Sequence, residues 1–486
     1  MRHMIVILDL GTTNIKATVM GETGETVSVQ ALSTPVLYRK DSMEIDPVRL
    51  WETVLDCCRG ALNALPEPAK IDAVAISSMA ASFVPVDGQG RALLPAIGWS
   101  DSRSTPYMER YMKQFLAGQR ISNCGQYPLP MYAGFKLQWV KDHHPDAFRA
   151  TKKWLNVSEL IYSRLSGRCD YVTDYSIASR TMLFDVARAD WNPAALVYFD
   201  LDPDLLPTPL PAGTPIGTAA PETWEAGLSP DTLIVLGGHD HMCAVVGAGI
   251  THPGIVLNST GTSEAVECLV PDDSAPEEMA ARWINLERAV LPGQSAAVYY
   301  VGATGRVYQS ACESIRDYDT FRFPNPEGDM IFLPPQRAQL PTVKGELKGI
   351  SPLFSSQELT RTIRDGMYYE CRRGIQRITG GEPNENTMIR CVGGHTKNRF
   401  EMQLKSDATG CVIELSRRKE DISSKGAFIL AGVGCGWYSS IPETAEQLYA
   451  LVEKERLYPD PVRSKQYAEI YHDRYLPQFA DGENSL

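Results

Sequence analysis

The chain of 486 residues carries a formal net charge of −12, and 43% of its residues are hydrophobic while 22% are charged. This length fits two or more domains of ordinary size, and the hydrophobic share is enough to bury sizeable cores. The acidic balance argues against nucleic acid and anionic membrane surfaces as partners, because both need a basic patch.

The 11 cysteines are odd in number and include no CxxC pair, which favours a reduced compartment over a disulfide framework. The first residues lack the length and the small-residue cleavage site of a signal peptide. No apolar stretch approaches the roughly 20 residues that a membrane-spanning helix needs. We therefore expect a cytoplasmic protein that binds neither membrane nor nucleic acid.

In the first half of the chain, apolar runs beside turn residues predict strands, and an apolar spacing of three to four residues predicts helices. The expected strands are Met4–Leu8, Ile15–Met20, Val27–Ala31, Ile71–Ser77 and Leu233–Leu236. The expected helices are Asp46–Leu65, Gly134–His143 and Leu155–Leu165.

The second half continues the alternation of strands and helices. Its expected strands are Val256–Ser259, Met388–Val392 and Val412–Leu415, and its expected helices are Ser356–Thr379, Arg399–Ala408 and Lys425–Gly434. A Gly-Thr turn follows an apolar strand early in each half, at Asp9–Thr13 and at Ser259–Ser263. A duplicated domain fold would produce this weak repeat, and so would chance.

The segment Asp9–Lys16 places the first Gly-Thr turn between two strands. Gly11 lets the backbone approach an anion, and Thr12 and Thr13 offer hydroxyl and N–H donors. Lys16 can bring a point charge to a phosphate, and Asp9 can hold Mg²⁺ through water. The alternative is an ordinary hairpin with Asp9 as a turn residue, and the P-loop pattern is absent.

The segment Gly237-Gly238-His239-Asp240-His241 follows an apolar strand and opens a run of small residues. Two glycines leave space beside the carboxylate, and a helix N-terminus there favours an anion, which suits a catalytic base. Aspartate is also a preferred N-cap residue, which alone would explain it. Zinc binding by the two histidines would lack a further ligand nearby.

Two later glycine turns allow similar alternatives. Ser259–Ser263 gathers donors around Gly261, which suits either a second phosphate cradle or a hydrogen-bonded Ser/Thr turn. In Cys391–Asn398, the pair Gly393-Gly394 either lets a flat group such as a nucleobase lie on the backbone or forms a tight strand-to-helix turn. No GxGxxG dinucleotide fingerprint is present.

The segment Trp99–Arg103 combines an aromatic face, a carboxylate and a guanidinium. The ring can cover the C–H faces of a polyhydroxy compound while Asp101 and Arg103 bind its hydroxyls. A surface ion pair is the alternative interpretation of the two charged residues.

Taken in chain order, these motifs resemble those of the FGGY family of carbohydrate kinases, within the superfamily of sugar kinases, Hsp70 and actin. They are similar to its first phosphate motif, catalytic aspartate segment, second phosphate motif and adenosine segment. Lys136–His143 is similar to a family signature, although Ala133 stands where Pro, Ser or Thr is usual. Thr173–Ser179 is similar to the segment that precedes the catalytic motif.

The resemblance, which runs from about residue 4 to about residue 450, implies an α/β fold of two ribonuclease-H-like, actin-like ATPase domains flanking a deep cleft. Residues 1–250 would bind the sugar and residues 251–486 would bind ATP, with the boundary near Ala248–Pro253. ATP and Mg²⁺ are the implied co-substrate and cofactor. Family members are often dimers, so a homodimer is an expected assembly.

The resemblance also implies roles for single residues. Asp240 would be the catalytic base, and Asp9 and Asp240 would hold Mg²⁺ through water. The residues expected to bind ATP are Thr12, Thr13, Lys16, Gly261, Thr262, Gly305, Gly393, Gly394 and Asn398. The residues expected to bind the acceptor are Met79, Trp99, Asp101, Arg103, Asp240 and His241.

The implied activity is the ATP-dependent phosphorylation of a hydroxyl of a small sugar or polyol. A ketose is favoured, because the Asp101/Arg103 pair suits a neutral polyhydroxy chain. The alternatives are a catalytically inactive sugar or nucleotide sensor on the same fold, and an ATP-driven chaperone or filament protein.

Three segments depart from the family pattern and leave the acceptor and the adenine pocket open. Ser77–Ala81 lacks the Gln-Met-His of xylulose kinases, and Leu333–Arg337 lacks the usual Gly-Glu-Arg. Gly302–Ser310 keeps a glycine but lacks the tryptophan that often follows.

Overall fold

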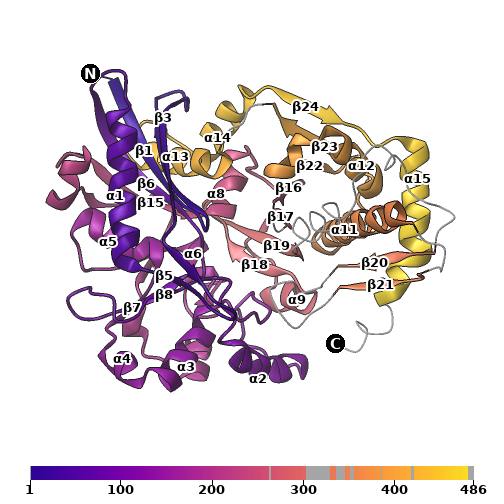
Figure 1. The fold of residues 1–486 in the computed structure, drawn as a ribbon, viewed down its shortest axis with the longest axis horizontal. Coiled ribbons are helices and arrows are strands. Elements are labelled where there is room, and N and C mark those ends of the chain that lie inside the picture. Colours follow the sequence, from indigo (N-terminus) through magenta and orange to yellow (C-terminus); the bar gives the residue numbers. More distant parts are fainter. Residues whose placement is uncertain are drawn as a thin grey trace.

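The computed structural model describes residues 2–261, 264–302, 329–334, 345–350, 355–384, 386–417 and 421–479. Two large mixed sheets dominate these residues, one in each half of the chain. Figure 1 shows the first half in indigo to magenta on one side and most of the second half in pink to yellow on the other. Helices pack against both sheets, which gives a layered α/β architecture.

The first sheet has the strand order β14-β15-β6-β1-β2-β3. β1 pairs antiparallel with β2 and parallel with β6, β2 pairs antiparallel with β3, and β6 pairs parallel with β15. The bounds are Arg2–Leu10 for β1, Asn14–Met20 for β2, Thr26–Ser33 for β3, Ala69–Ser78 for β6, Pro215–Thr218 for β14 and Leu233–His239 for β15.

The second sheet has the order β18-β19-β17-β16-β22-β23-β24. β16 pairs antiparallel with β17 and parallel with β22, β17 pairs antiparallel with β19, and β22 pairs parallel with β23. This core repeats the pairing of the first sheet, as a duplicated fold requires. The bounds are Ile255–Thr260 for β16, Glu264–Pro271 for β17, Asn285–Arg288 for β18, Gln294–Gly302 for β19, Met388–Val392 for β22, Val412–Ser416 for β23 and Lys454–Leu457 for β24.

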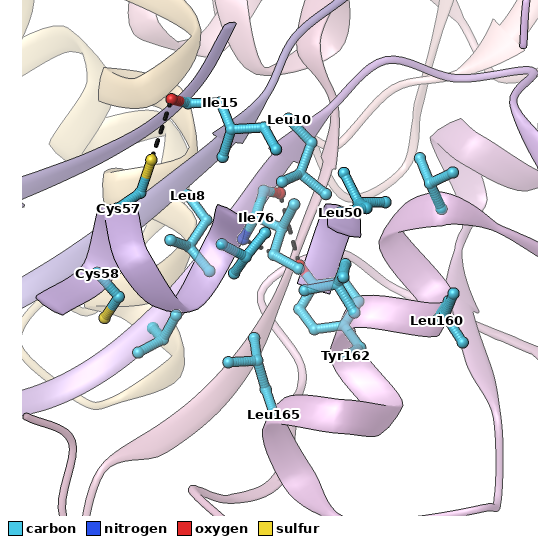
Figure 2. Packing of buried hydrophobic residues seen from close by; sticks show 14 of the residues in the cluster. Leu8, Leu10, Ile15, Leu50, Cys57, Cys58, Ile76, Leu160, Tyr162 and Leu165 are labelled. Atoms are coloured by element: carbon cyan, nitrogen blue, oxygen red, sulfur yellow. Dashed lines mark hydrogen bonds between the residues drawn. The ribbon is translucent and has the colours of Figure 1, made fainter. Parts of the chain in front are cut away.

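Alternate residues of β1 face two different apolar cores, because side chains along a strand alternate between the faces of the sheet. Leu8 packs with helices α1 (Pro47–Asn63) and α5 (Val157–Ser166), and Figure 2 shows it beside Ile76, on the side toward Cys57 and Cys58. Ile7 belongs to the core on the other face, which contains residues of α8 (Asp240–Gly247) and α13 (Ile422–Gly434). Burial on both faces explains the nearly continuous apolar run of this strand.

The sequence prediction places the start of α5 two residues too early. Asn156 and Glu159 form a capping box, in which each side chain accepts a backbone N–H at the helix start. The helix therefore begins at Val157, and Leu155 belongs to strand β9 (Lys153–Asn156).

Helices α8 and α13 pack with their backbones in contact, as the small residues of 425–434 predict. A Cβ at Gly426 would lie 1.8 Å from the carbonyl oxygen of Cys243, and a Cβ at Gly247 would lie 2.0 Å from that of Ile422. α13 also packs on β1, β6 and β15. A helix from the second half thus lies against the first sheet, and Figure 1 shows it beside the indigo strands.

No helix among the described residues is long and apolar enough to cross a membrane. Smaller elements make up the rest of the described structure. A five-stranded sheet has the order β4-β5-β8-β7-β9, with β4 at Val36–Tyr38, β5 at Met43–Ile45, β7 at Phe83–Val86 and β8 at Ala96–Ile97. The other strands are β10 (Val172–Asp174), β11 (Phe184–Asp185), β12 (Asp190–Trp191), β13 (Thr208–Leu210), β20 (Ile331–Leu333) and β21 (Glu346–Lys348). The other helices are α2 (Thr105–Leu116), α3 (Ala133–His143), α4 (Pro145–Ala150), α6 (Tyr175–Ser179), α7 (Pro193–Phe199), α9 (Pro276–Ala281), α11 (Ser356–Thr379), α12 (Arg399–Thr409), α14 (Ile441–Ala450) and α15 (Pro461–Ile470), with short turns η1 (Pro203–Leu205), η2 (Pro221–Ala226), η3 (Gly394–Lys397), η4 (Tyr471–Tyr475) and η5 (Leu476–Phe479).

Candidate active site

The first Gly-Thr turn joins β1 to β2 and is closed by backbone contacts. Gly11 N donates to the carbonyl of Asn14 over 3.1 Å, and Thr34 Oγ1 donates to the carbonyl of Gly11 over 2.7 Å. A Cβ at Gly11 would lie only 2.9 Å from the Asn14 oxygen, so a larger residue would crowd the turn. Thr12 is half-buried and Thr13 is exposed, which leaves both threonines at the edge of the sheet.

Asp9 and Lys16 face each other across this hairpin. Lys16 Nζ lies 3.2 Å from Asp9 Oδ2 and 2.7 Å from Asp421 Oδ2. Burial and the charges of Asp421 and Asp240 raise the pKa of Asp9, Lys16 offsets part of the rise, and the resulting pKa is about 7. Asp9 is therefore a carboxylate surrounded by negative charge, with the Lys16 ammonium as a close counter-charge.

Asp421 is not among the site residues predicted from the sequence. It caps α13, where its Oδ1 accepts from Ser423 Oγ over 2.9 Å and from Ser424 N over 3.3 Å. Aspartate followed by serines at a helix start indicates an N-cap and nothing more. Only the packing of α13 on the first sheet brings this residue to Lys16.

The two glycines of the predicted catalytic segment lie in β15, which contains a register shift against β6 between Val235 and Gly238. A Cβ at Gly237 would lie 2.0 Å from the carbonyl oxygen of Ile76. Tyr162 Oη accepts from Gly237 N over 2.7 Å and from Ile76 N over 3.1 Å, and Figure 2 shows its ring next to Ile76. The tyrosine therefore satisfies two N–H groups at an irregular point of the sheet.

Asp240 is the first residue of α8, and 31% of its side chain is exposed. Its Oδ1 accepts from His241 N over 2.8 Å and lies 3.1 Å from His239 Nε2. Burial alone would raise the pKa of Asp240, but the hydrogen bond and charge of His239 and the charge of His241 lower it to about 2. The N-cap position belongs to His239, and its side chain makes no cap hydrogen bond, so an N-cap role does not explain Asp240.

Two buried glutamates of the second sheet face the histidines beside Asp240. His241 Nδ1 pairs with Glu267 Oε1, and His239 Nδ1 lies 3.7 Å from Glu287 Oε2. The two imidazoles stack with their centroids 5.0 Å apart. His239, Asp240 and His241 are close enough together to hold a metal ion, but these contacts favour carboxylate-paired imidazoles over a zinc site.

The predicted acceptor residues lie near one another around the first turn. Trp99 Nε1 donates to Thr12 Oγ1 over 2.9 Å. Met79 is buried, and its N–H donates to the carbonyl of Leu10 over 3.0 Å. These contacts link the expected acceptor side of the site directly to the expected phosphate turn.

Asp101 and Arg103 are paired with each other, as the sequence suggests, but Asp101 is only 2% exposed. Its oxygens accept from Met43 N over 3.0 Å and from Arg103 Nη2 over 2.7 Å. Arg103 also donates to Glu44 over 2.8 Å and lies 4.4 Å above the Trp139 ring. Asp101 thus holds Arg103 in place, and Arg103 is the partly exposed member of the pair.

Lys136 of the family signature is a buried cation that supports this region. Its Nζ donates to the carbonyls of Ala81 over 2.6 Å and Gly98 over 2.8 Å. Burial lowers the pKa of this lysine to about 7. The carbonyl contacts fix the two loops that carry Met79 and Trp99.

The two later segments that the resemblance assigns to ATP meet at the end of β16. Gly393 has a positive φ of 102°, and a Cβ there would lie 2.2 Å from the carbonyl oxygen of Thr260, next to Gly261. Gly394 faces open space, and Asn398 caps α12 by accepting from Glu401 N over 3.3 Å. Thr262 and Gly305, also predicted to bind ATP, lie outside the described residues.

Family comparisons agree with this arrangement. The N-terminal domain model of the FGGY family of carbohydrate kinases matches residues 4–247, and its C-terminal domain model matches residues 256–435. The chain belongs to the FGGY family of carbohydrate kinases. It is therefore a carbohydrate kinase with the two-domain actin-like ATPase fold, which confirms both the resemblance and the predicted fold class.

Relatives of this FGGY kinase act on different acceptors. It is 25% identical to a glycerol kinase of Coxiella burnetii, over 97% of this chain and 96% of the relative, and 23% identical to a xylulose kinase of Bacillus subtilis, over 96% and 95%. Among solved structures, a gluconate kinase from Lactobacillus acidophilus aligns with a TM-score of 0.87 at 20% identity, covering 99% of this chain and 98% of that one. A xylulose kinase from the same organism gives 0.86 at 19%, with 99% of both chains covered. These similarities establish the fold but do not identify the acceptor.

Proposed function

We propose that this FGGY kinase transfers the γ-phosphoryl group of ATP to a hydroxyl of a small sugar or polyol, with Asp240 as the general base. The proposal rests on the position, the exposure and the pKa of Asp240. It begins α8, is partly exposed, and has a pKa held near 2 against the opposing effect of burial. An ionised carboxylate at this position can accept the proton of an attacking hydroxyl.

The other residues fit a reaction governed by positioning and charge, because the transferred phosphoryl group passes through a loose transition state. Lys16 lies beside the first Gly-Thr turn and supplies a positive charge for phosphate oxygens. Thr12 and Thr13 supply donors on the turn. Gly394 faces open space, which leaves the backbone there accessible to the adenosine group.

The carboxylates around Asp9 fit a hard divalent cation. Asp9 is buried near the charges of Asp240 and Asp421, with the Lys16 ammonium offsetting only part of their effect on its pKa. Oxygen ligands and surplus negative charge are what Mg²⁺ requires. When bound, Mg²⁺ would neutralise charge on the nucleotide phosphates, and Asp9 and Asp240 would hold it through water.

We extend the proposal to the domain boundary and to the acceptor. Residues 1–250 and 251–486 would form the two domains, with α8 and α13 in contact between them. A ketose is our preferred acceptor. Arg103 is partly exposed and held by Asp101, so it can donate to the hydroxyls of a neutral chain. A cytoplasmic location and a homodimer stay predictions.

The test is a panel of ketoses, aldonates and polyols supplied with ATP and Mg²⁺ and scored by ADP formation. We expect turnover that requires one structural class of acceptor, with a ketose giving the highest kcat/KM. Slow ATP hydrolysis independent of every acceptor would favour a chaperone-like or filament-like role. ATP binding without turnover on any acceptor would favour the inactive sensor.

A further inference from the structure

The duplicated fold gives Asp240 a counterpart in the second half. In the first sheet the parallel strands run β1, β6, β15, and α8 with Asp240 at its start follows the last of them. In the second sheet they run β16, β22, β23, and α13 with Asp421 at its start follows the last. Asp9 experiences the charges of both aspartates. The fold thus brings a second helix-start carboxylate to the proposed phosphate site.

Both oxygens of Asp421 are engaged in fixed directions. Oδ1 binds Ser423 Oγ and Ser424 N within its own helix, and Oδ2 lies 2.7 Å from Lys16 Nζ. The side chains of Asp421 and Lys16 are 29% and 35% exposed, so solvent only partly screens the pair. The helix cap therefore sets the direction in which the carboxylate holds the lysine.

Lys16 has three N–H donors, and this geometry commits two of them. One lies toward Asp9 Oδ2 at 3.2 Å and one toward Asp421 Oδ2 at 2.7 Å. The ammonium group of Lys16 makes only these two hydrogen bonds to the residues that the structure describes. An ammonium held at two corners presents its remaining N–H in a restricted direction.

We propose that Asp421 is a positioning residue for phosphoryl transfer, which fixes Lys16 so that its third N–H meets a nucleotide phosphate. The proposal rests on the kinase function proposed above. Holding a flexible lysine in advance removes the entropic cost of fixing it during the reaction.

The contact between Asp421 and Lys16 is not needed to hold α13 in place. α13 is already anchored by its apolar core with β1 and α8, in which Ala427, Phe428 and Leu430 are buried. Asparagine and serine cap helices about as well as aspartate. Asp421→Asn and Asp421→Ser therefore remove the charged contact with Lys16 and keep the cap of α13.

A double-mutant cycle isolates the coupling between Asp421 and Lys16 in the free energy of nucleotide binding. Isothermal titration calorimetry would measure the binding of a non-hydrolysable ATP analogue with Mg²⁺ to the full-length wild type, Lys16→Met, Asp421→Asn and the double variant. Any direct repulsion between Asp421 and phosphate is present with or without Lys16, so it cancels in the cycle.

We expect the loss from Lys16→Met to be about tenfold smaller in the Asp421→Asn background than in the wild type, a coupling typical of residues in contact. Equal losses in both backgrounds, or a larger loss in the Asp421→Asn background, would overturn the proposal. The Asp421→Ser cycle repeats the test if the first variant does not fold. Asp460→Asn, at the start of α15, is the matched control and should leave the Lys16→Met effect unchanged.

Kinetics add a second readout once an acceptor is known. Asp421→Asn should lower kcat about tenfold, because a Lys16 ammonium that is no longer held in place stabilises the transferred phosphoryl group less well. An unchanged kcat would contradict the positioning role. If no acceptor in the panel is phosphorylated, the proposed function is wrong. The calorimetric cycle still tests the effect of Asp421 on Lys16, because it needs only the ATP analogue.

Discussion

Glu159 is a buried carboxylic acid in the first turn of α5, the helix that also carries Tyr162. Its Oε2 accepts from Asn156 N over 2.6 Å, and it lines a cavity of about 400 Å³ together with Tyr162. Burial raises the pKa of Glu159 to about 8, and the charge of Asp174 adds to the rise against the hydrogen bonds from Thr173 and Asn156. The folded state therefore keeps a proton on this group that the unfolded chain releases near pH 4.5.

This difference predicts how Glu159→Gln changes stability with pH. The folded state binds more protons than the unfolded state between about pH 4.5 and 8, so the wild type loses stability relative to the variant as pH rises through this window. The relative loss should be on the order of 3–5 kcal/mol, from about 1.4 kcal/mol per pKa unit. Urea unfolding of the wild type and the variant at pH 5 and pH 8 measures this loss. A difference in unfolding free energy between the two proteins that does not change with pH would contradict the prediction.

How much of the site the sequence predicts differs from residue to residue. Asp9, Lys16 and Asp240 stand out only because their motifs follow one another in the order of the FGGY family, since each motif alone also fits a turn or a helix cap. Asp421 cannot be found this way, because its local pattern only indicates a helix cap. Its meeting with Lys16 depends on the packing of an element 405 residues away in the chain.

Among the elements, the crossing of α8 and α13 is the most tightly constrained contact. The carbonyl of Cys243 and the Cα of Gly426 leave no space for a methyl group, since a Cβ would lie 1.8 Å from that oxygen. Both atoms belong to helix backbones, which cannot turn aside as a side chain does. Any added atom must push the two helices apart.

Gly426→Ala should therefore destabilise the protein by about 3 kcal/mol or more, at the upper end of overpacking effects. The matched control is Gly381→Ala, where no atom lies within 4 Å of the added Cβ and φ is not positive. Chemical denaturation of both variants gives the comparison. Equal stability of the two variants would contradict the close-packed crossing.

The boundaries of elements show why local patterns are incomplete. Strand β15 runs through Gly237 and Gly238 to His239, where the sequence predicts an end at Leu236. Glycines usually end a strand, but here the N–H of Gly237 donates a hydrogen bond to Tyr162 of helix α5. A tertiary hydrogen bond of this kind has no trace in the local sequence.

At the scale of the whole molecule, the two Gly-Thr segments are only a weak sign of the duplication that the two sheets display, because chance would also produce such a repeat. The equal order of hairpin and parallel strands in both sheets then explains why the segment Ser259–Ser263 begins at the end of β16, as the segment Asp9–Thr13 begins at the end of β1. Cross-contacts between halves, such as Glu267 with His241, follow from the three-dimensional assembly alone. The roles of Thr262 and Gly305 stay predictions, because both lie outside the described residues.

Asp240→Asn is the sharpest test of whether the two halves assemble a kinase whose base is Asp240. The substitution keeps the shape of the side chain and removes its ability to take a proton. With the acceptor found by the panel, kcat should fall at least about a hundredfold, the scale of general-base loss, while calorimetry shows ATP still binding. Turnover close to that of the wild type would rule out Asp240 as the base.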